Sequence, residues 1–133
     1  MESSGMFYRE KKKAHILVVD DNAMVLRNVK MILDANYTVA VAASATQAFM
    51  AIGKKKPDLI LLDYQMPVVD GKAFFEMIMK EEELSEIPVV FLTGVADKDV
   101  VQQILALKPA GYMLKTLDVN TMTDVIAEVL RSK

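Results

Sequence analysis

Three aspartates, a threonine and a lysine stand where short apolar segments of the sequence end. Asp20 and Asp21 follow the first segment, Asp63 comes at the end of the third, Thr93 follows the fourth and Lys115 the fifth. Carboxylates suit Mg²⁺, which typically uses one or two of them, keeps several waters and accepts phosphate oxygens. With Mg²⁺ and a lysine supplying positive charge, a carboxylate can act as nucleophile toward a phosphoryl group. These residue types therefore indicate phosphoryl transfer to an aspartate.

The apolar segments before these residues are short and continuous, which is typical of parallel strands covered on both faces. They span residues 16–19, 38–42, 59–62, 89–92 and 112–114, and segments with helical spacing alternate with them. This alternation predicts right-handed βαβ crossovers and a doubly wound α/β fold with a five-stranded parallel sheet. Ligands bind beyond the carboxyl ends of the strands in such sheets, so we expect the five polar residues to meet there.

Capping residues and apolar stripes predict the five helices. Ser44 and Gln47 form a capping box for the second helix, and Asp118 is the expected N-cap of the fifth. Asn36 is expected to end the first helix, and Pro109 to terminate the fourth. The expected buried faces are Val25, Val29, Ile32 and Leu33; Ala48, Phe49 and Ile52; Phe74, Phe75, Ile78 and Met79; Val100, Val101, Ile104 and Leu105; and Met122, Val125, Ile126, Val129 and Leu130.

Length and composition limit the class of protein. The 133 residues suit one domain, which we place at residues 14–133 after a polar, flexible segment of residues 1–13. The absence of cysteine excludes disulfide scaffolds, thiolate metal sites and cysteine nucleophiles. The formal net charge of −2 argues against direct nucleic-acid binding, and no apolar run is long enough for a membrane helix. We expect a cytoplasmic protein without membrane contact.

The acidic pair, Asp63, Met66-Pro67, Asp70-Gly71, Thr93 and Lys115 together resemble the motif set of the response-regulator receiver domain. The resemblance extends over residues 14–130. It implies a chemotaxis-regulator-like member of two-component signalling, with a flavodoxin-like three-layer sandwich and strand order 2-1-3-4-5. It also implies a signalling domain that catalyses only its own phosphorylation and dephosphorylation, rather than an enzyme.

The resemblance assigns a role to each site residue. Asp63 matches the phosphoacceptor, which takes its phosphoryl group from a phosphohistidine of a sensor histidine kinase or phosphotransfer protein. Asp21 resembles the direct Mg²⁺ ligand beside Asp63, with Asp20 reaching the metal mainly through water. The backbone carbonyl of Gln65 completes the protein ligands, and no organic cofactor is implied.

The same resemblance assigns a switch. Thr93 matches the switch hydroxyl, Tyr112 the aromatic switch residue, and Lys115 the lysine that pairs with phosphoryl oxygens. The family usually has a cis proline after this lysine, whereas Thr116 stands here, so the Lys115–Thr116 bond is either cis or trans. The lysine of Lys108-Pro109 precedes the fifth strand and is not expected to be the site lysine.

Other functions remain open from the residues alone. Asp20 and Asp21 are also good caps for the first helix. A degenerate receiver would serve only as a docking or dimerisation module, and a flavodoxin-like cofactor binder would place glycine or hydroxyl groups in the first loop.

In the receiver interpretation, the surface of the fourth helix, fifth strand and fifth helix meets an effector, an output domain or, after phosphorylation, a second copy. The chain is either a stand-alone receiver or part of a larger regulator or hybrid kinase.

Overall fold

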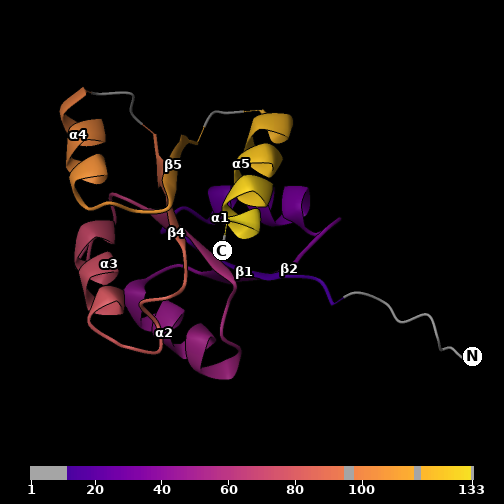
Figure 1. Ribbon diagram of the computed structural model, residues 1–133, viewed down its shortest axis with the longest axis horizontal. Coiled ribbons are helices and arrows are strands. Elements are labelled where there is room, and N and C mark those ends of the chain that lie inside the picture. The colour runs from indigo at the N-terminus through magenta and orange to yellow at the C-terminus, as the bar shows by residue number, and fades with distance from the viewer. Residues whose placement is uncertain (1–11, 95–97, 116–117, 133) are drawn as a thin grey trace, which may run out of the picture.

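Five parallel strands form one sheet, and a helix follows each strand (Figure 1). The computed structural model describes residues 12–94, 98–115 and 118–132. The strands are β1 (His15–Val19), β2 (Thr38–Ala42), β3 (Leu59–Asp63), β4 (Val89–Thr93) and β5 (Gly111–Leu114). The helices are α1 (Ala23–Leu33), α2 (Ala45–Lys54), α3 (Gly71–Met79), α4 (Lys98–Ala106) and α5 (Val119–Arg131). The order β2-β1-β3-β4-β5 confirms the predicted doubly wound fold.

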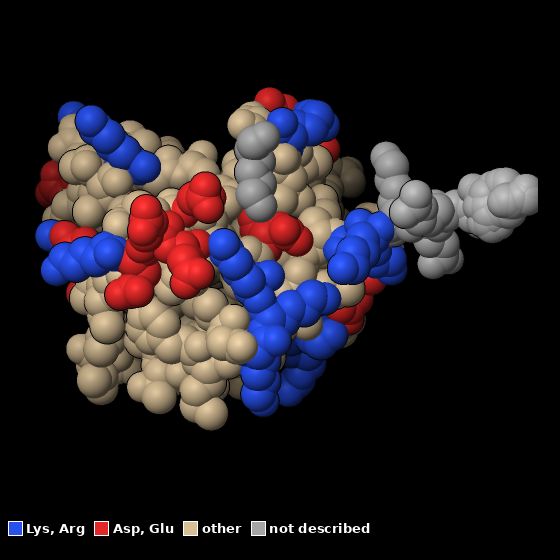
Figure 2. All heavy atoms as spheres, turned by 60° about the horizontal axis from the view of Figure 1, so that its bottom comes forward, with Lys and Arg blue, Asp and Glu red and all other residues tan. Residues whose placement is uncertain are grey.

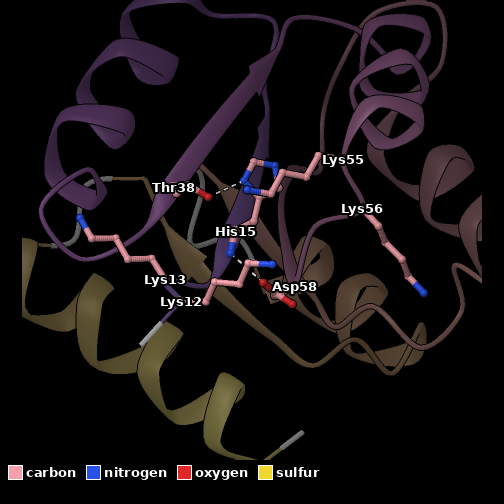
Figure 3. Close-up of a pocket in the computed structure, with 7 residues that line it drawn as sticks. All are labelled: Lys12, Lys13, His15, Thr38, Lys55, Lys56 and Asp58. Carbon is pink, nitrogen blue, oxygen red and sulfur yellow. Dashed lines mark hydrogen bonds between the residues drawn. The ribbon is translucent and has the colours of Figure 1, made fainter. Parts of the chain in front are cut away.

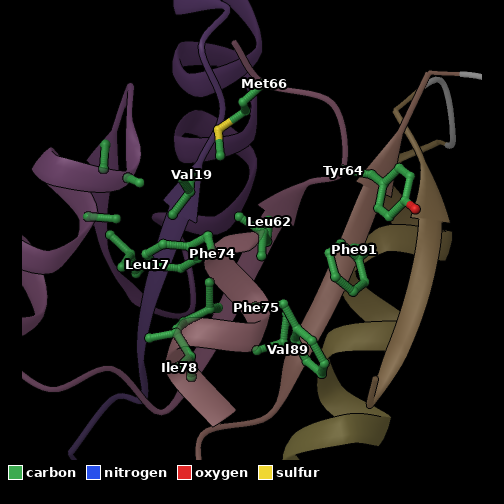
Figure 4. Packing of buried hydrophobic residues seen from close by; sticks show 14 of the residues in the cluster. Leu17, Val19, Leu62, Tyr64, Met66, Phe74, Phe75, Ile78, Val89 and Phe91 are labelled. Atoms are coloured by element: carbon green, nitrogen blue, oxygen red, sulfur yellow. The ribbon is translucent and has the colours of Figure 1, made fainter. Parts of the chain in front are cut away.

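The sheet lies between two helical layers with a separate core on each face. Residues of α2, α3 and α4 contribute to one core, and residues of α1 and α5 to the other. Figure 4 shows the first core, where Phe74 and Ile78 of α3 pack against residues of β1 and β3. Every residue of β1, β3 and β4 is buried, as the continuous apolar pattern predicts. The edge strands β2 and β5 are only partly buried, because each has a neighbour on one side alone.

The helix starts follow the predicted capping residues. Ser44 Oγ accepts a hydrogen bond from the Gln47 N–H, and Asp118 accepts one from the Thr121 N–H. The predicted end of the first helix at Asn36 is wrong. Helix α1 ends at Leu33, and Asp34, which is paired with Lys30, is its C-cap.

Two helical faces differ from the predicted ones. The helical spacing predicts Met79 and Leu105 in the core, but they are 38% and 53% exposed. Helix α4 buries Ile104 alone because it covers the region of the sheet next to the edge strand β5, where little surface is available (Figure 1). In the part of the chain that the structure describes, no helix has the length and apolar character required to cross a bilayer.

Candidate functional site

Three carboxylates meet at the carboxyl end of the sheet. Asp63 is the last residue of β3, and Asp20 follows β1, whose Val19 pairs with Leu62. Because β1 and β3 are neighbours, the two aspartates lie side by side, and both are buried at 0% and 2% exposure. Asp21 is exposed beside them, and ligand oxygens of all three lie within 4.8 Å of one another. The predicted convergence of Asp20, Asp21 and Asp63 is confirmed geometrically.

The first loop does not use its aspartates as the helix cap. Asn22 is the N-cap of α1, and its side-chain oxygen accepts hydrogen bonds from the backbone N–H groups of Met24 and Val25 at 2.9 and 3.2 Å. Asp20 instead accepts the N–H of Asn22 through Oδ1 at 2.9 Å, which fixes the turn after β1. The capping interpretation of Asp20 and Asp21 is therefore wrong, and Asp21 is exposed beside the two buried aspartates.

Lys115 reaches the same site from the end of β5. Its backbone N–H donates to the Thr93 carbonyl at 2.9 Å, which continues the pairing of Thr93 with Leu114. Its Nζ lies 2.8 Å from Asp20 Oδ2 and 3.1 Å from Asp63 Oδ1. The conformation of the Lys115–Thr116 bond lies outside the described residues. Lys108 is exposed before β5, so Lys115 is the lysine of this site.

Burial and charge set the protonation behaviour of the site. Burial, reinforced by the neighbouring Asp20 charge, raises the pKa of Asp63 to about 6, although Lys115 acts in the opposite direction. Burial would lower the pKa of Lys115, but its contacts with Asp20 and Asp63 raise it instead. Asp63 is therefore ionised above about pH 6, and Lys115 stays charged beside it.

Two buried carboxylate oxygens have no hydrogen-bond partner among the described residues. Asp63 Oδ1 contacts Lys115 and accepts the Gln65 N–H at 3.2 Å, whereas Oδ2 has no hydrogen-bond partner among the described residues. Asp20 Oδ2 is also buried and makes only an ion pair with Lys115, without hydrogen-bond geometry. A buried, unsatisfied carboxylate oxygen is costly. Two such oxygens beside the exposed Asp21 fit the oxygen ligands of a hydrated divalent cation.

Thr93 and Tyr112 occupy neighbouring strands on the same face of the sheet. Thr93 ends β4 and is 1% exposed, whereas Tyr112 in β5 is 38% exposed. Tyr112 pairs with Phe91 and Leu114 with Thr93, so the tyrosine lies two positions back along the adjacent strand. The structure brings the two predicted switch residues into adjacent strands, with the tyrosine at the surface.

Sequence reasoning missed a contact between β3 and α4. The hydroxyl of Tyr64, the residue after Asp63, donates to Gln103 Oε1 at 3.0 Å, and its ring packs edge-on against Phe91 at 5.5 Å. An aromatic residue directly after the buried aspartate was the available signal. Its partner lies 39 residues away, so spacing along the chain does not indicate it.

The loop after β3 depends on close backbone packing. Asp70 is the N-cap of α3, and the Gly71 N–H donates to the Tyr64 carbonyl at 3.1 Å. A Cβ atom at Gly71 would collide with the carbonyl oxygen of Asp63 and lie 2.8 Å from Tyr64 Cα. The Asp70-Gly71 pair therefore allows α3 to begin directly against the Asp63 backbone. Val68 in the same loop is fully exposed and has a φ of 67°, which is unusual for a β-branched residue.

Comparison with known proteins places this arrangement in a family. The model of the response regulator receiver domain matches residues 16–127. The phosphate regulon transcriptional regulatory protein PhoB of Pseudomonas aeruginosa is 31% identical over 117 residues, which cover 87% of this chain and 51% of that protein. A protein-glutamate methylesterase/protein-glutamine glutaminase 2 of a Shewanella species is 30% identical over 125 residues, which cover 88% of this chain and 35% of that protein. The chain thus spans about half or less of the length of these two relatives.

Solved structures agree with this match. The chemotaxis protein CheY4 of Vibrio cholerae superposes with a TM-score of 0.80 at 27% identity, covering 88% of this chain and 98% of that one. The receiver domain of a histidine kinase from Syntrophus aciditrophicus superposes with a TM-score of 0.80 at 25% identity, covering 90% and 91% of the two chains. The resemblance found in the sequence is confirmed over most of its extent. The chain belongs to the response regulator receiver domain family.

Proposed function

We propose that this receiver domain is a phosphorylation-activated switch of a two-component phosphorelay, with Asp63 as the phosphoacceptor. The observation that carries the proposal is the buried Asp63 carboxylate, whose Oδ1 contacts Lys115 and whose Oδ2 has no hydrogen-bond partner within residues 12–94, 98–115 and 118–132. Asp21 is the exposed member of the three carboxylates, so a phosphoryl donor would approach from its side. We assign the receiver domain to residues 14–133 and leave residues 1–13 as a preceding segment.

The reaction follows from these positions. The ionised Asp63 oxygen attacks the phosphorus of a phosphohistidine, a P–O bond forms, and the P–N bond breaks with its electron pair going to the histidine nitrogen. Lys115 pairs with a phosphoryl oxygen, and the Thr93 hydroxyl donates to another. The raised pKa of Asp63, about 6, leaves the nucleophile ionised at neutral pH.

A Mg²⁺ ion fits the carboxylate cluster. Asp21 would bind it directly, Asp20 mainly through water, and Asp63 together with the Gln65 carbonyl would complete the protein ligands. The ion, when bound, supplies positive charge that lowers the repulsion between an incoming phosphoryl group and the three aspartates. The support is the proximity of the three carboxylates and the unsatisfied oxygens of Asp20 and Asp63.

The signal leaves through the surface of α4, β5 and α5 in this proposal. Thr93 moves toward the phosphoryl group, and the exposed Tyr112 ring turns into the space beside α4. The changed surface then binds an effector, an output domain or a second copy of the chain. The input partner is a sensor histidine kinase or phosphotransfer protein. The intact set of Asp20, Asp21, Asp63 and Lys115 argues against a degenerate module that serves only for docking.

The first prediction concerns the phosphoryl group itself. Incubation with acetyl phosphate and Mg²⁺ should add one phosphoryl group to the intact chain, and peptide mapping should place it on Asp63. The physical reason is that the acidic cluster repels phosphate donors until a divalent cation neutralises it. Intact-mass measurement follows the addition over time.

Two controls accompany this experiment. Asp63→Asn should remove the added mass, and a chelator should suppress it in the parent chain. Label on another residue, or full labelling in chelator, would contradict the assignment of Asp63.

A further inference from the structure

A basic hollow lies at the opposite end of the sheet from Asp63. It has a volume of about 710 Å³ and opens beside the amino ends of β1 and β2. This volume falls within the range of roughly 300–1,000 Å³ that is common for small-ligand sites. Its lining residues are Lys12, Lys13, His15, Thr38, Lys55, Lys56 and Asp58 (Figure 3).

The lysines come from two separate parts of the chain. Lys12 and Lys13 precede β1, whereas Lys55 and Lys56 follow α2. Figure 3 shows Lys12 and Lys55 extending toward His15 and Asp58, with Lys13 and Lys56 extending outward at the two sides. Figure 2 shows lysine and arginine side chains gathered over this end of the molecule, with acidic side chains grouped next to them. Folding therefore places two basic segments, distant in sequence, around one hollow.

Lysines outnumber carboxylates among the described residues that line the hollow. Four lysines and one carboxylate, Asp58, line it, and Asp58 Oδ2 accepts the His15 backbone N–H at 2.7 Å. The ion pairs found among the described residues, such as Lys30–Asp34 and Arg131–Glu128, include none of the four lysines. Their mutual repulsion favours a bound anion.

The end of α2 explains only part of this arrangement. Lysines at a helix C-terminus interact favourably with the helix dipole, which accounts for Lys55 and Lys56 as a solvated helix end. That explanation does not extend to Lys12 and Lys13, which belong to no helix. It also does not explain why His15 is buried among these cations, with its Nδ1 2.7 Å from the Thr38 hydroxyl.

The geometry points to a binding site for a multiply charged phosphate group in this hollow, held by Lys12 and Lys55 and covered by Lys13 and Lys56. Lysine binds phosphate as a flexible point charge, so the two outer side chains can turn inward around a ligand. A ligand with several negative charges matches four ammonium groups better than a single carboxylate does. The same chemistry is offered by a soluble oligophosphate and by the headgroups of anionic phospholipids.

His15 provides a specific probe because it is the only histidine of the chain. Burial, together with the positive charge of Lys55, lowers the pKa of His15, although Asp58 and the Thr38 contact act in the opposite direction. The other charged groups that line the hollow around it are Lys12, Lys13 and Lys56. A phosphate group bound here would stabilise the imidazolium, so the His15 pKa should rise on binding.

The test follows the His15 ring signal by NMR during titration with inorganic pyrophosphate. A chelator is present throughout, so that no divalent cation attracts phosphate to the acidic site. We expect saturable shifts of the His15 ring and of amides around Lys12 and Lys55, and a raised His15 pKa at saturation. In a second arm, vesicles of phosphatidylglycerol are sedimented with the chain and compared with vesicles of neutral phosphatidylcholine.

Matched variants connect the result to the hollow. Lys55→Gln with Lys56→Gln should weaken pyrophosphate or vesicle binding by about tenfold or more, since two charge-assisted contacts are lost. Lys80→Gln with Lys108→Gln removes the same charge from exposed positions elsewhere and should leave binding unchanged. Asp63→Asn should bind as the parent does, which separates this proposal from the phosphorelay.

The arms also separate the two sources of phosphate. Saturable pyrophosphate shifts support a soluble oligophosphate as the ligand, and sedimentation with phosphatidylglycerol alone supports a lipid headgroup. Absence of binding in both arms at millimolar phosphate would overturn the proposal. Equal weakening by the two pairs of substitutions would overturn it as well, because the attraction would then be a property of total charge.

Discussion

The pKa of Asp63 connects the chemistry of the site with the stability of the fold. Its carboxylate is buried beside Asp20, and these two effects raise its pKa to about 6 from an ordinary value of 3.8. The folded protein therefore binds a proton at Asp63 more tightly than the unfolded chain does. The stability that this proton provides is fully present below pH 3.8 and is lost as the pH rises through about 6. At neutral pH, the ionised Asp63 therefore lowers the free energy of unfolding.

Removing this charge should stabilise the domain. In chelator, Asp63→Asn should raise the free energy of unfolding by about 3 kcal/mol at neutral pH and by roughly half of that at about pH 5. Urea unfolding of the parent and the variant at the two pH values measures the difference. Addition of Mg²⁺ should stabilise the parent more than the variant. A difference that does not grow with pH would contradict the raised pKa of Asp63.

Lys115 supplies the only ion pairs to Asp20 and Asp63 among the described residues. Lys115→Ala should lower the free energy of unfolding by about 1–3 kcal/mol, because buried carboxylate oxygens lose their partner. It should also weaken the response to beryllofluoride, a phosphoryl mimic, as followed by amide chemical shifts. Lys108→Ala is the control; this exposed residue should change stability by less than about 0.5 kcal/mol. Equal effects of the two changes would contradict the assignment of Lys115 to the phosphoryl site.

At the scale of elements, the apolar runs predict all five strands to within one residue at each end. A strand that is buried on both faces carries apolar side chains at nearly every position. Its sequence is therefore a continuous apolar run, which is easy to recognise. Helical faces are less certain: the same spacing predicts a buried Leu105, yet α4 lies near the sheet edge and exposes it. The positions of five site residues could be predicted because each stands at a strand end or directly after it: Asp20, Asp21, Asp63, Thr93 and Lys115. The Tyr64–Gln103 contact could not, since it depends on how α4 is rotated.

The junction between β3 and α3 gives a test of backbone packing. Gly71→Ala should lower the free energy of unfolding by at least about 1 kcal/mol, since the added Cβ meets the Asp63 and Tyr64 backbone. Gly53→Ala in α2 is the matched control, because a Cβ there meets nothing within 4 Å. This change should stabilise the domain by about 0.5–1 kcal/mol through helix propensity. Thermal unfolding of both variants measures these two changes in stability. Stabilisation by both substitutions would mean that the loop between β3 and α3 moves to accommodate the added Cβ of Gly71→Ala.

At the scale of the whole molecule, the sheet separates two charged ends. Three aspartates with Lys115 lie at the carboxyl end, and the four lysines of the hollow lie at the amino end. The formal net charge of −2 sums over the acidic end and the basic end, so it indicates neither of them. Composition alone argues against a basic surface, and it is the βαβ topology that brings residues 12–13 and 55–56 together. The buried central strands β1, β3 and β4 separate the two ends.

The last prediction concerns transmission from the acidic end to the surface of α4, β5 and α5. Anionic phosphoryl oxygens accept short, strong hydrogen bonds, so a phosphoryl group on Asp63 should draw the Thr93 hydroxyl inward. This movement would free space for the Tyr112 ring, which is exposed and lies on the neighbouring strand. Two conformations that differ by a few kcal/mol suffice for such a switch.

Thr93→Ala should therefore still accept beryllofluoride at Asp63 but lose the response of α4, β5 and α5. Amide chemical shifts of the parent, of Thr93→Ala and of Thr46→Ala would be compared with and without beryllofluoride and Mg²⁺. Thr46 is exposed on α2, away from this surface, so Thr46→Ala should respond as the parent does. Shifts near Asp63 in all three proteins would establish that the mimic binds. If α4, β5 and α5 then respond equally in Thr93→Ala, the signal does not pass from Thr93 to Tyr112, and the Tyr64–Gln103 contact is a candidate for the link between the Asp63 loop and α4.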